Sequence, residues 1–240
     1  MALGSQVGPY RILGELGGGG MGLVYRAVHT QLDRPTAIKV LRPELAHSVW
    51  ALDRFLNEAR AASALRHPGV IEIYDYGVMP SGRPFIAMEL LDGMTLGRCL
   101  AGDRLPPADA ARLARQIASA LAAAHEVGIV HRDLKPDNLF LVRDPRTGAH
   151  DRAKLLDFGI ARRDGQAQPH ADIVLGTPAY MAPEQCRDDG DCDHRADLYA
   201  LGCVLFEMLS GQPPFGHGPA EMLSAAHLVA PIPDLAARGD

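Results

Sequence analysis

The spacing of apolar residues changes once along the chain, close to Leu90, and this change limits the fold more than any other feature. Before it, short apolar runs alternate with turn residues, which is typical of strands. One run, 48–65, instead has helical spacing, and so does the Ala-rich segment 106–126 after the change. The sequence therefore predicts an α+β chain, with an antiparallel sheet and one helix followed by a mainly helical part. The five predicted strands cover 10–16, 23–28, 36–41, 70–76 and 85–90.

The segment 196–209 is apolar on nearly every side, which predicts a helix that is buried all round. Its apolar residues include Leu198, Leu201, Val204, Leu205 and Met208. By contrast, the segment 213–233 is rich in Pro, Gly and Ala and is predicted to be loosely structured.

Composition narrows the classes of function. With 240 residues, of which 47% are hydrophobic, the chain can bury the core of one large domain or two small lobes. A net charge of −5 without any Lys/Arg-rich run argues against a nucleic-acid partner. No apolar run approaches the ~20 residues that span a bilayer, so a cytoplasmic protein is expected. The four cysteines suit unpaired thiols, since Cys186, Cys192 and His194 match no standard zinc spacing.

Three glycines, at 17, 19 and 22, form a GxGxxG pattern between two predicted strands. A dinucleotide-binding loop of this pattern opens a helix, whereas here 23–25 continues as a strand. The pattern therefore predicts a hairpin whose backbone can approach phosphates, with an unliganded flexible hairpin as the alternative.

Lys39 lies on the strand that follows this hairpin, where its ammonium could reach phosphates beneath the glycine loop. Glu58 lies with the apolar stripe of the predicted helix 48–65 and is the partner expected to hold Lys39 extended.

The octapeptide HRDLKPDN, 131–138, carries the most chemical information in the chain. Asp133 could take the proton of an attacking hydroxyl, and Lys135 could neutralise a transferring phosphoryl group. Asn138 could ligate Mg²⁺ through its amide oxygen. A solvated polar turn is the alternative, and so many charges in one loop argue against it.

Two further motifs follow. Asp157-Phe158-Gly159 offers a carboxylate for a second metal contact, an apolar anchor and a glycine that permits hinge dihedral angles. The segment GTPAYMAPE, 176–184, comes at a suitable distance beyond it. Asp197 begins the apolar helix, where it could also serve as an N-cap.

These motifs, in this order, resemble the eukaryotic-type protein kinases from Tyr10 onward. Lys135 and Thr177 are similar to their counterparts in serine/threonine kinases, and LGGGGMGLVYRA resembles the bacterial members. The resemblance implies a two-lobed protein kinase fold over 10–240, with an N-lobe at 10–88, an incomplete C-lobe at 89–240 and MgATP between the lobes. It also implies protein substrates with Ser/Thr acceptors, autophosphorylation through a homodimer, and Mg²⁺ with Mn²⁺ as a substitute.

The same resemblance assigns roles to individual positions. Val24 and Ala37 roof the adenine, Phe140 forms its floor, and Met88 is the gatekeeper of the hinge 88–91. The implied nucleotide-binding residues are Leu16, Gly17, Gly18, Gly19, Gly20, Met21, Gly22, Val24, Ala37, Lys39, Met88, Glu89, Leu91 and Phe140. The implied catalytic residues are the base Asp133 with Lys135, Lys39 and Glu58; the metal ligands are Asn138 and Asp157; and the activation-segment residues are Thr177, Glu184 and Asp197.

Arg132 is typical of kinases whose activation loop is ordered by a phosphate, because a buried arginine needs an anionic partner. Yet the sequence between Asp157 and Thr177 has no Ser, Thr or Tyr. We hypothesise that Asp164 or Asp172 supplies a fixed negative charge instead.

The end of the sequence also departs from the pattern. Family members continue past the Pro-rich stretch near Pro231 with further helices and an arginine that pairs with Glu184, whereas this sequence stops at Asp240. The resemblance therefore implies a truncated C-lobe and a chain of marginal stability.

Two rival interpretations stay open. One is an inactive, pseudokinase-like ATP-binding or interaction module, which truncation favours and the complete set Lys39, Asp133, Asn138 and Asp157 disfavours. The other is a small-molecule phosphotransferase, which Lys135 and the GTPAYMAPE segment disfavour.

Overall fold

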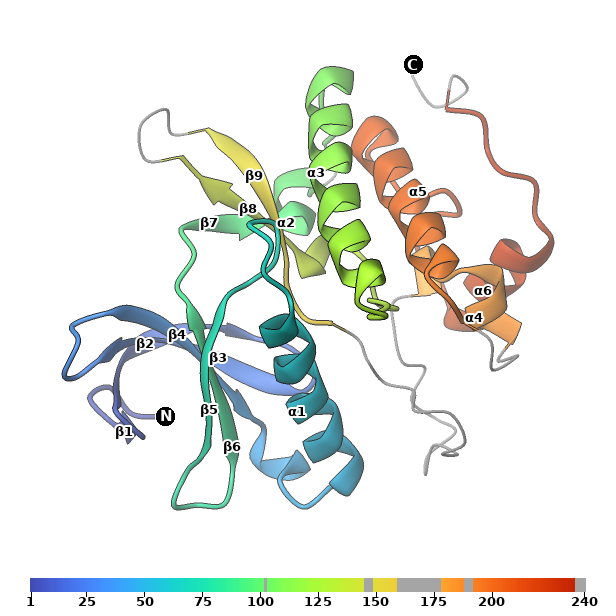
Figure 1. The fold of residues 1–240 in the computed structure, drawn as a ribbon. Coiled ribbons are helices and arrows are strands. Elements are labelled where there is room, and N and C mark those ends of the chain that lie inside the picture. Colours follow the sequence, from blue (N-terminus) through green and yellow to red (C-terminus); the bar gives the residue numbers. More distant parts are fainter. Residues whose placement is uncertain (102, 145–148, 159–177, 188–191, 236–240) are drawn as a thin grey trace. The chain divides into compact units, whose positions relative to one another are not determined.

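The computed structural model describes residues 1–101, 103–144, 149–158, 178–187 and 192–235. The chain divides into two compact units (Figure 1). The first consists of Met1–Arg66 and Ile71–Asp92, and the second of His67–Val70 and Gly93–Asp240. None of the helices among the described residues is both long enough and apolar enough to cross a membrane.

The first unit contains a six-stranded antiparallel sheet in the order β1-β2-β3-β4-β6-β5. All five predicted strands are present within a few residues of their predicted bounds. The sixth, β1, pairs with the start of β2 and is only two residues long, too short for an alternating pattern to reveal it. The strands are β1 (Gln6–Val7), β2 (Tyr10–Gly18), β3 (Gly22–His29), β4 (Pro35–Leu41), β5 (Ile73–Val78) and β6 (Pro84–Glu89).

The predicted helix of this unit is α1 (Val49–Ala64), which follows the 3-10 turn η1 (Pro43–Leu45). It begins where the Ser48 side chain accepts the backbone N–H of Ala51, which satisfies one of the otherwise unpaired N-terminal donors. Phe55 of α1 packs with Leu41 and Ile86 of the sheet. Because side chains alternate along a strand, this face of β4 also carries Lys39.

The second unit is mainly helical and has a three-stranded sheet in the order β7-β8-β9. Its longest helix, α3, packs against α5 and β9 (Figure 1). The elements are β7 (Gly93–Thr95), α2 (Leu96–Leu100), α3 (Pro107–Glu126), η2 (Pro136–Asn138), β8 (Leu139–Arg143), β9 (His150–Leu155), η3 (Pro178–Tyr180), α4 (Pro183–Arg187), α5 (Arg195–Ser210) and α6 (Ala220–Val229).

Two predictions about this unit were wrong. Helix α5 is not buried all round, because Leu198 is 51% exposed while Val204 and Met208 are buried. An apolar sequence shows that a helix can be covered on every side, but not which sides its neighbours reach. The segment 213–233, predicted to be loosely structured, contains the helix α6. Pro219 provides a helix start, and the ten residues after it contain neither Gly nor Pro.

Candidate active site

A buried ion pair in the first unit joins the two residues predicted to bind phosphates. Lys39 Nζ donates to Glu58 Oε1 at 2.5 Å, and the two side chains are 8% and 11% exposed. Lys39 reaches α1 because it lies on the face of β4 that this helix covers. The structure therefore brings this predicted pair together, and the ammonium has a fixed direction.

The glycine loop, 19–21, joins β2 to β3 and is closed by a hydrogen bond from Gly19 N–H to Gly22 O at 2.9 Å. Arg42 holds this loop from outside. Its Nε donates to Gly19 O at 2.9 Å, and its backbone N–H donates to Met21 O at 3.0 Å. Sequence reasoning missed Arg42. Only the pairing of Gly22 with Leu41 shows that Arg42, the residue after Leu41, lies beside the loop.

Gly22 is required by close packing. A Cβ at this position would lie 3.0 Å from Val40 O and 3.3 Å from Lys39 Cγ. The glycine therefore lets β3 approach the stem of the phosphate-binding candidate Lys39.

The other predicted nucleotide-binding residues divide between the two units. Ala37 is buried on β4, Val24 is half-buried on β3, and Met88 packs against the α1 side of the sheet. Phe140 lies on β8 of the second unit and pairs with Lys154. Of the rest, Leu16, Gly18, Gly19 and Gly20 are exposed, and Gly17, Met21, Glu89 and Leu91 are half-buried.

The second unit places three predicted residues around one carboxylate. Lys135 Nζ lies 3.1 Å from Asp133 Oδ2 and 3.3 Å from Oδ1. Asn138 Nδ2 donates to the backbone oxygen of Asp133 at 2.7 Å and to its Oδ2 at 3.1 Å. The loop therefore fixes the direction of the Asp133 carboxylate and sets a cation beside it.

The two predicted metal ligands lie at adjoining ends of paired strands. Asn138 directly precedes β8, and Asp157 follows β9 by two residues; Leu139 pairs with Leu155. The backbone N–H of Leu156 donates to Asn138 O at 2.9 Å, which extends the pairing one step toward Asp157.

This donor set fits Mg²⁺. Both hydrogen bonds of the Asn138 side chain use Nδ2, so its hard Oδ1 oxygen is available to a cation, and Asp157 is exposed. Among the described residues, no group of three or more His, Cys, Asp or Glu could hold a metal ion by itself. Mg²⁺ typically binds through one or two protein oxygens together with substrate phosphates and waters, which matches such a pair.

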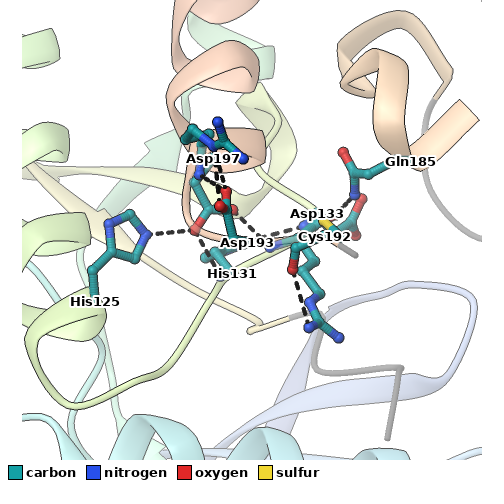
Figure 2. Close-up of polar contacts among 9 residues, drawn as sticks. His125, His131, Asp133, Gln185, Cys192, Asp193 and Asp197 are labelled. Atoms are coloured by element: carbon teal, nitrogen blue, oxygen red, sulfur yellow. Dashed lines mark hydrogen bonds and ion pairs between the residues drawn. The ribbon is translucent and has the colours of Figure 1, made fainter. Parts of the chain in front are cut away.

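Asp197 organises the backbone of the candidate catalytic loop, residues 131–138 (Figure 2). Its Oδ2 accepts the backbone N–H of His131, and its Oδ1 accepts that of Arg132, both at 2.8 Å. His125 Nε2 lies 2.8 Å from the same Oδ2. The N-cap role considered for Asp197 was wrong, because His194 occupies that position and Asp197 is the third residue of the helix.

His131 anchors the loop from the inside. It is fully buried, and its ring lies 4.9 Å from the ring of Phe158. Burial lowers the pKa of His131, against the opposing effect of Asp197 and the other nearby carboxylates. A neutral ring therefore ties the catalytic loop to the residue that follows Asp157.

Arg132 makes contacts with the segments on either side of the residues 188–191. Its Nη2 donates to Cys192 O at 3.3 Å, and its backbone oxygen accepts from Gln185 Nε2 at 2.8 Å (Figure 2). A cavity of roughly 10 Å³, bordered by Arg132, Tyr180 and Asp197, has room for about one water molecule.

Of the activation-segment residues, Glu184 is half-buried on α4. Thr177, and the proposed phosphate substitutes Asp164 and Asp172, lie outside the described residues, as does Gly159.

A second buried pair lies beside this segment. Tyr180 donates through its hydroxyl to Glu207 Oε2 at 2.6 Å, and Glu207 is 8% exposed. Burial raises the pKa of Glu207, against the hydrogen bond from Tyr180. Sequence reasoning missed Glu207, although an acid within the apolar stretch 198–209 was the available signal, since a buried charge needs a partner.

Comparisons with known proteins agree with this geometry. The protein kinase domain family model matches residues 10–232. The serine/threonine-protein kinase pkn3 of Myxococcus xanthus is 41% identical over 230 residues, which cover 93% of this chain and 42% of pkn3. The serine/threonine-protein kinase PknD of Mycobacterium tuberculosis is 42% identical over 233 residues, which cover 96% of this chain and 34% of PknD. The chain thus spans less than half the length of these two relatives.

A solved structure is similar over the whole chain. The kinase domain of Mycobacterium tuberculosis PknI gives a TM-score of 0.74 at 31% identity, covering 100% of this chain and 85% of that one. The predicted fold class is confirmed by this likeness.

Proposed function

We propose that this chain, which belongs to the protein kinase domain family, transfers the γ-phosphate of MgATP to Ser/Thr hydroxyls of proteins. Its own hydroxyls are included, by autophosphorylation between two copies. The relatives described above are bacterial serine/threonine-protein kinases. The observation that carries the proposal is the carboxylate of Asp133, oriented by Asn138 and accompanied by the ammonium of Lys135.

In this proposal Asp133 accepts the proton of the attacking hydroxyl. Asn138 keeps the carboxylate in one orientation through its two hydrogen bonds, which lowers the cost of reaching a productive geometry. Lys135, 3.1 Å from that carboxylate, stabilises the negative charge that develops on the transferring group.

The nucleotide-binding residues of the first unit bind the adenine and the phosphates. Val24, Ala37 and Met88 contact the adenine, Lys39 pairs with phosphate oxygens, and Glu58 keeps that ammonium extended. The backbone of the glycine loop approaches the phosphates, because its residues have no side chains in the way. Mg²⁺, with Mn²⁺ as a substitute, neutralises phosphate charge when Asn138 and Asp157 hold it.

The proposal also places the limits of the domain. We assign the kinase domain to 10–240, with its N-lobe at 10–88 and its C-lobe at 89–240. The family match over 10–232 supports the start of the domain at residue 10 and most of this span.

The experiment is transfer of labelled γ-phosphate from MgATP to a generic Ser/Thr substrate and to the chain itself, followed by phosphoamino acid analysis. Asp133→Ala should reduce incorporation by about 10²- to 10⁴-fold, the usual contribution of a positioned general base. Asp193→Ala is the matched control, since Asp193 is exposed and its side chain bonds only the nearby Arg195 among the described contacts. The rate of self-labelling per molecule should rise with protein concentration.

Two outcomes would overturn the proposal. ATP binding without transfer by the folded wild-type chain would favour an inactive ATP-binding module. Equal incorporation by wild type and Asp133→Ala would remove the base from the mechanism.

A further inference from the structure

The side chain of Glu89 makes a contact that the proposed chemistry does not use. Glu89 is the last residue of β6 and directly follows Met88 in the proposed hinge, 88–91. Sequence reasoning placed it among the nucleotide-binding residues but gave its carboxylate no part. The β4 side of this residue is fixed by the sheet, because Glu89 pairs with Thr36, which is fully buried. The other neighbour of β6 is β5.

The pairing of β5 with β6 is irregular just where it approaches the hinge. Its register shifts between Ile73 and Asp75, and the last regular pair is Ile73 with Met88. A shift of this kind leaves one residue without a partner in the ladder and disrupts the local backbone hydrogen bonds. The regular ladder therefore ends before it reaches Glu89.

The side chain of Glu89 continues the contact where the ladder ends. Its Oε1 accepts the backbone N–H of Glu72 at 2.8 Å, and the backbone N–H of Glu89 donates to Glu72 O at 2.9 Å. A hydrogen bond to a carboxylate is stronger than one between neutral groups. One side-chain bond and one backbone bond thus join the residue before β5 to the start of the hinge, and both lie within the first unit.

The other contacts near Glu72 do not fix the hinge. Arg34 Nη2 lies 3.9 Å from Glu72 Oε2, and these side chains are 48% and 65% exposed, so the pair contributes little. The guanidinium of Arg34 also stacks on the ring of Tyr74, 3.4 Å from its centre. Neither of these two contacts involves β6.

Resting on the proposed function, we infer that Glu89 is a positioning residue for the adenine base of MgATP and acts through its carboxylate. It fixes the backbone at the start of 88–91 before the nucleotide binds. Affinity is higher when the segment that contacts a ligand is already ordered, because less conformational freedom is lost on binding. The effect is expected for the base alone, since Lys39 and the glycine loop, the proposed phosphate-binding groups, make their contacts elsewhere in the first unit.

The test measures Kd in the full chain for two ligands, MgATP and magnesium tripolyphosphate, which lacks the base. Glu89→Ala removes the acceptor, whereas Glu89→Gln keeps an Oε1 oxygen that can accept the same N–H. We expect Kd for MgATP to rise about five-fold in Glu89→Ala, the effect of one ordinary hydrogen bond. It should stay within about two-fold of wild type in Glu89→Gln, and Kd for tripolyphosphate should stay within about two-fold in both variants.

Asp75→Ala is the matched control. Asp75 is exposed on β5, and its Oδ1 accepts the backbone N–H of Tyr76 at 2.8 Å, the same length as the bond between Glu72 and the Glu89 carboxylate. The bond of Asp75 stays within β5 and does not cross to β6. Its removal should therefore leave Kd for MgATP unchanged.

Other results would overturn the inference. An equal rise in Kd for MgATP and for tripolyphosphate would show a general defect of the first unit. An equal rise in Glu89→Ala and Glu89→Gln would assign the effect to charge instead of the hydrogen bond. The same rise in Asp75→Ala would show that the contact with the hinge is not what matters.

Amide hydrogen exchange reads the same contact without any ligand. The backbone N–H of Glu72 should exchange faster in Glu89→Ala than in wild type or in Glu89→Gln, and equal exchange in all three would also overturn the inference. Failure of the proposed function gives a different result. A wild-type chain that binds MgATP without transferring phosphate would refute the transfer, while the difference in Kd between Glu89→Ala and Glu89→Gln would still support the role of Glu89.

Discussion

The carboxylate of Asp197 holds Arg132, 65 residues away in sequence, by accepting its backbone N–H at 2.8 Å. Arg132 has φ of 63°, a left-handed conformation that costs a non-glycine residue about 1–3 kcal/mol. Because Arg132 directly precedes Asp133, this contact sets the direction in which the proposed base leaves the backbone.

Asp197→Asn tests this relationship. The amide keeps one oxygen acceptor but turns an N–H₂ group toward a backbone donor, so we expect a loss of about 1.5–3 kcal/mol in the free energy of unfolding. We also expect a lower kcat with little change in ATP affinity. Urea denaturation and steady-state kinetics measure the two effects. The control Asp193→Asn, on the exposed turn before α5, should leave both unchanged, and a similar loss in the control would contradict the argument.

The buried Lys39–Glu58 pair predicts strong non-additivity. Lys39→Met leaves the Glu58 charge buried without its ammonium partner, which typically costs about 3–5 kcal/mol. The double variant Lys39→Met/Glu58→Gln should recover part of that loss, because no buried charge then remains. Chemical denaturation of the single and double variants measures the recovery.

The surface pair Arg34–Glu72 is the matched control for that cycle. Its atoms lie 3.9 Å apart and its side chains are 48% and 65% exposed. Glu72→Gln should therefore cost no more than about 1 kcal/mol. If the losses in unfolding free energy caused by Lys39→Met and by Glu58→Gln simply added up in the double variant, the Lys39–Glu58 contact would contribute no more to stability than the exposed Arg34–Glu72 pair does.

Arg42 should matter for nucleotide affinity although it lies outside the glycine loop. Arg42→Ala removes the hydrogen bond to Gly19 O, so the loop samples more conformations and the Kd for MgATP should rise about five-fold. Titration with a fluorescent nucleotide measures this. Arg11→Ala, on an exposed position of β2, is the control, and the same Kd for both variants would refute the role of Arg42.

Glu207 predicts a specific dependence of stability on pH. Burial raises its pKa above the ordinary value of 4.5, so the folded chain binds this proton more tightly than the unfolded chain does. Stability from this group is therefore greatest at or below about pH 4.5 and declines as pH rises through the folded-state pKa.

Glu207→Gln isolates that contribution. The difference in unfolding free energy, wild type minus variant, should grow as pH is lowered toward 4.5 and become constant above the folded-state pKa. Denaturation curves at several pH values measure it. A pH-independent difference would show that the carboxyl keeps an ordinary pKa.

Sequence reasoning predicted the fold class and the ion pair partners because both depend on local signals. Strand alternation marks the sheet, and Glu58 shares a helical stripe with Phe55, so its direction follows from spacing alone. The candidate catalytic loop, 131–138, was predicted for the same reason, since the side chains proposed to act in it lie within eight consecutive residues.

What the sequence could not predict depends on neighbours distant in the chain. Arg42 is recognisable only from the register between β3 and β4. Asp197 was predicted as a site residue, but its hydrogen bonds to the backbone of His131 and Arg132 depend on a contact between segments far apart in the chain. Helix α6 was hidden by the prolines around it. The exposed side of α5, where Leu198 lies, depends on which elements pack against the helix.

The pairing of β8 with β9 has a consequence for the proposed metal ligands. Asn138 and Asp157 extend from neighbouring ends of this one ladder, which the bond from Leu156 to Asn138 prolongs. Their spacing is therefore a property of local backbone hydrogen bonds, and departure of a nucleotide would not pull them apart. Under the proposed function, each turnover begins with the backbone that carries both ligands already in place, because its hydrogen bonds form when the chain folds.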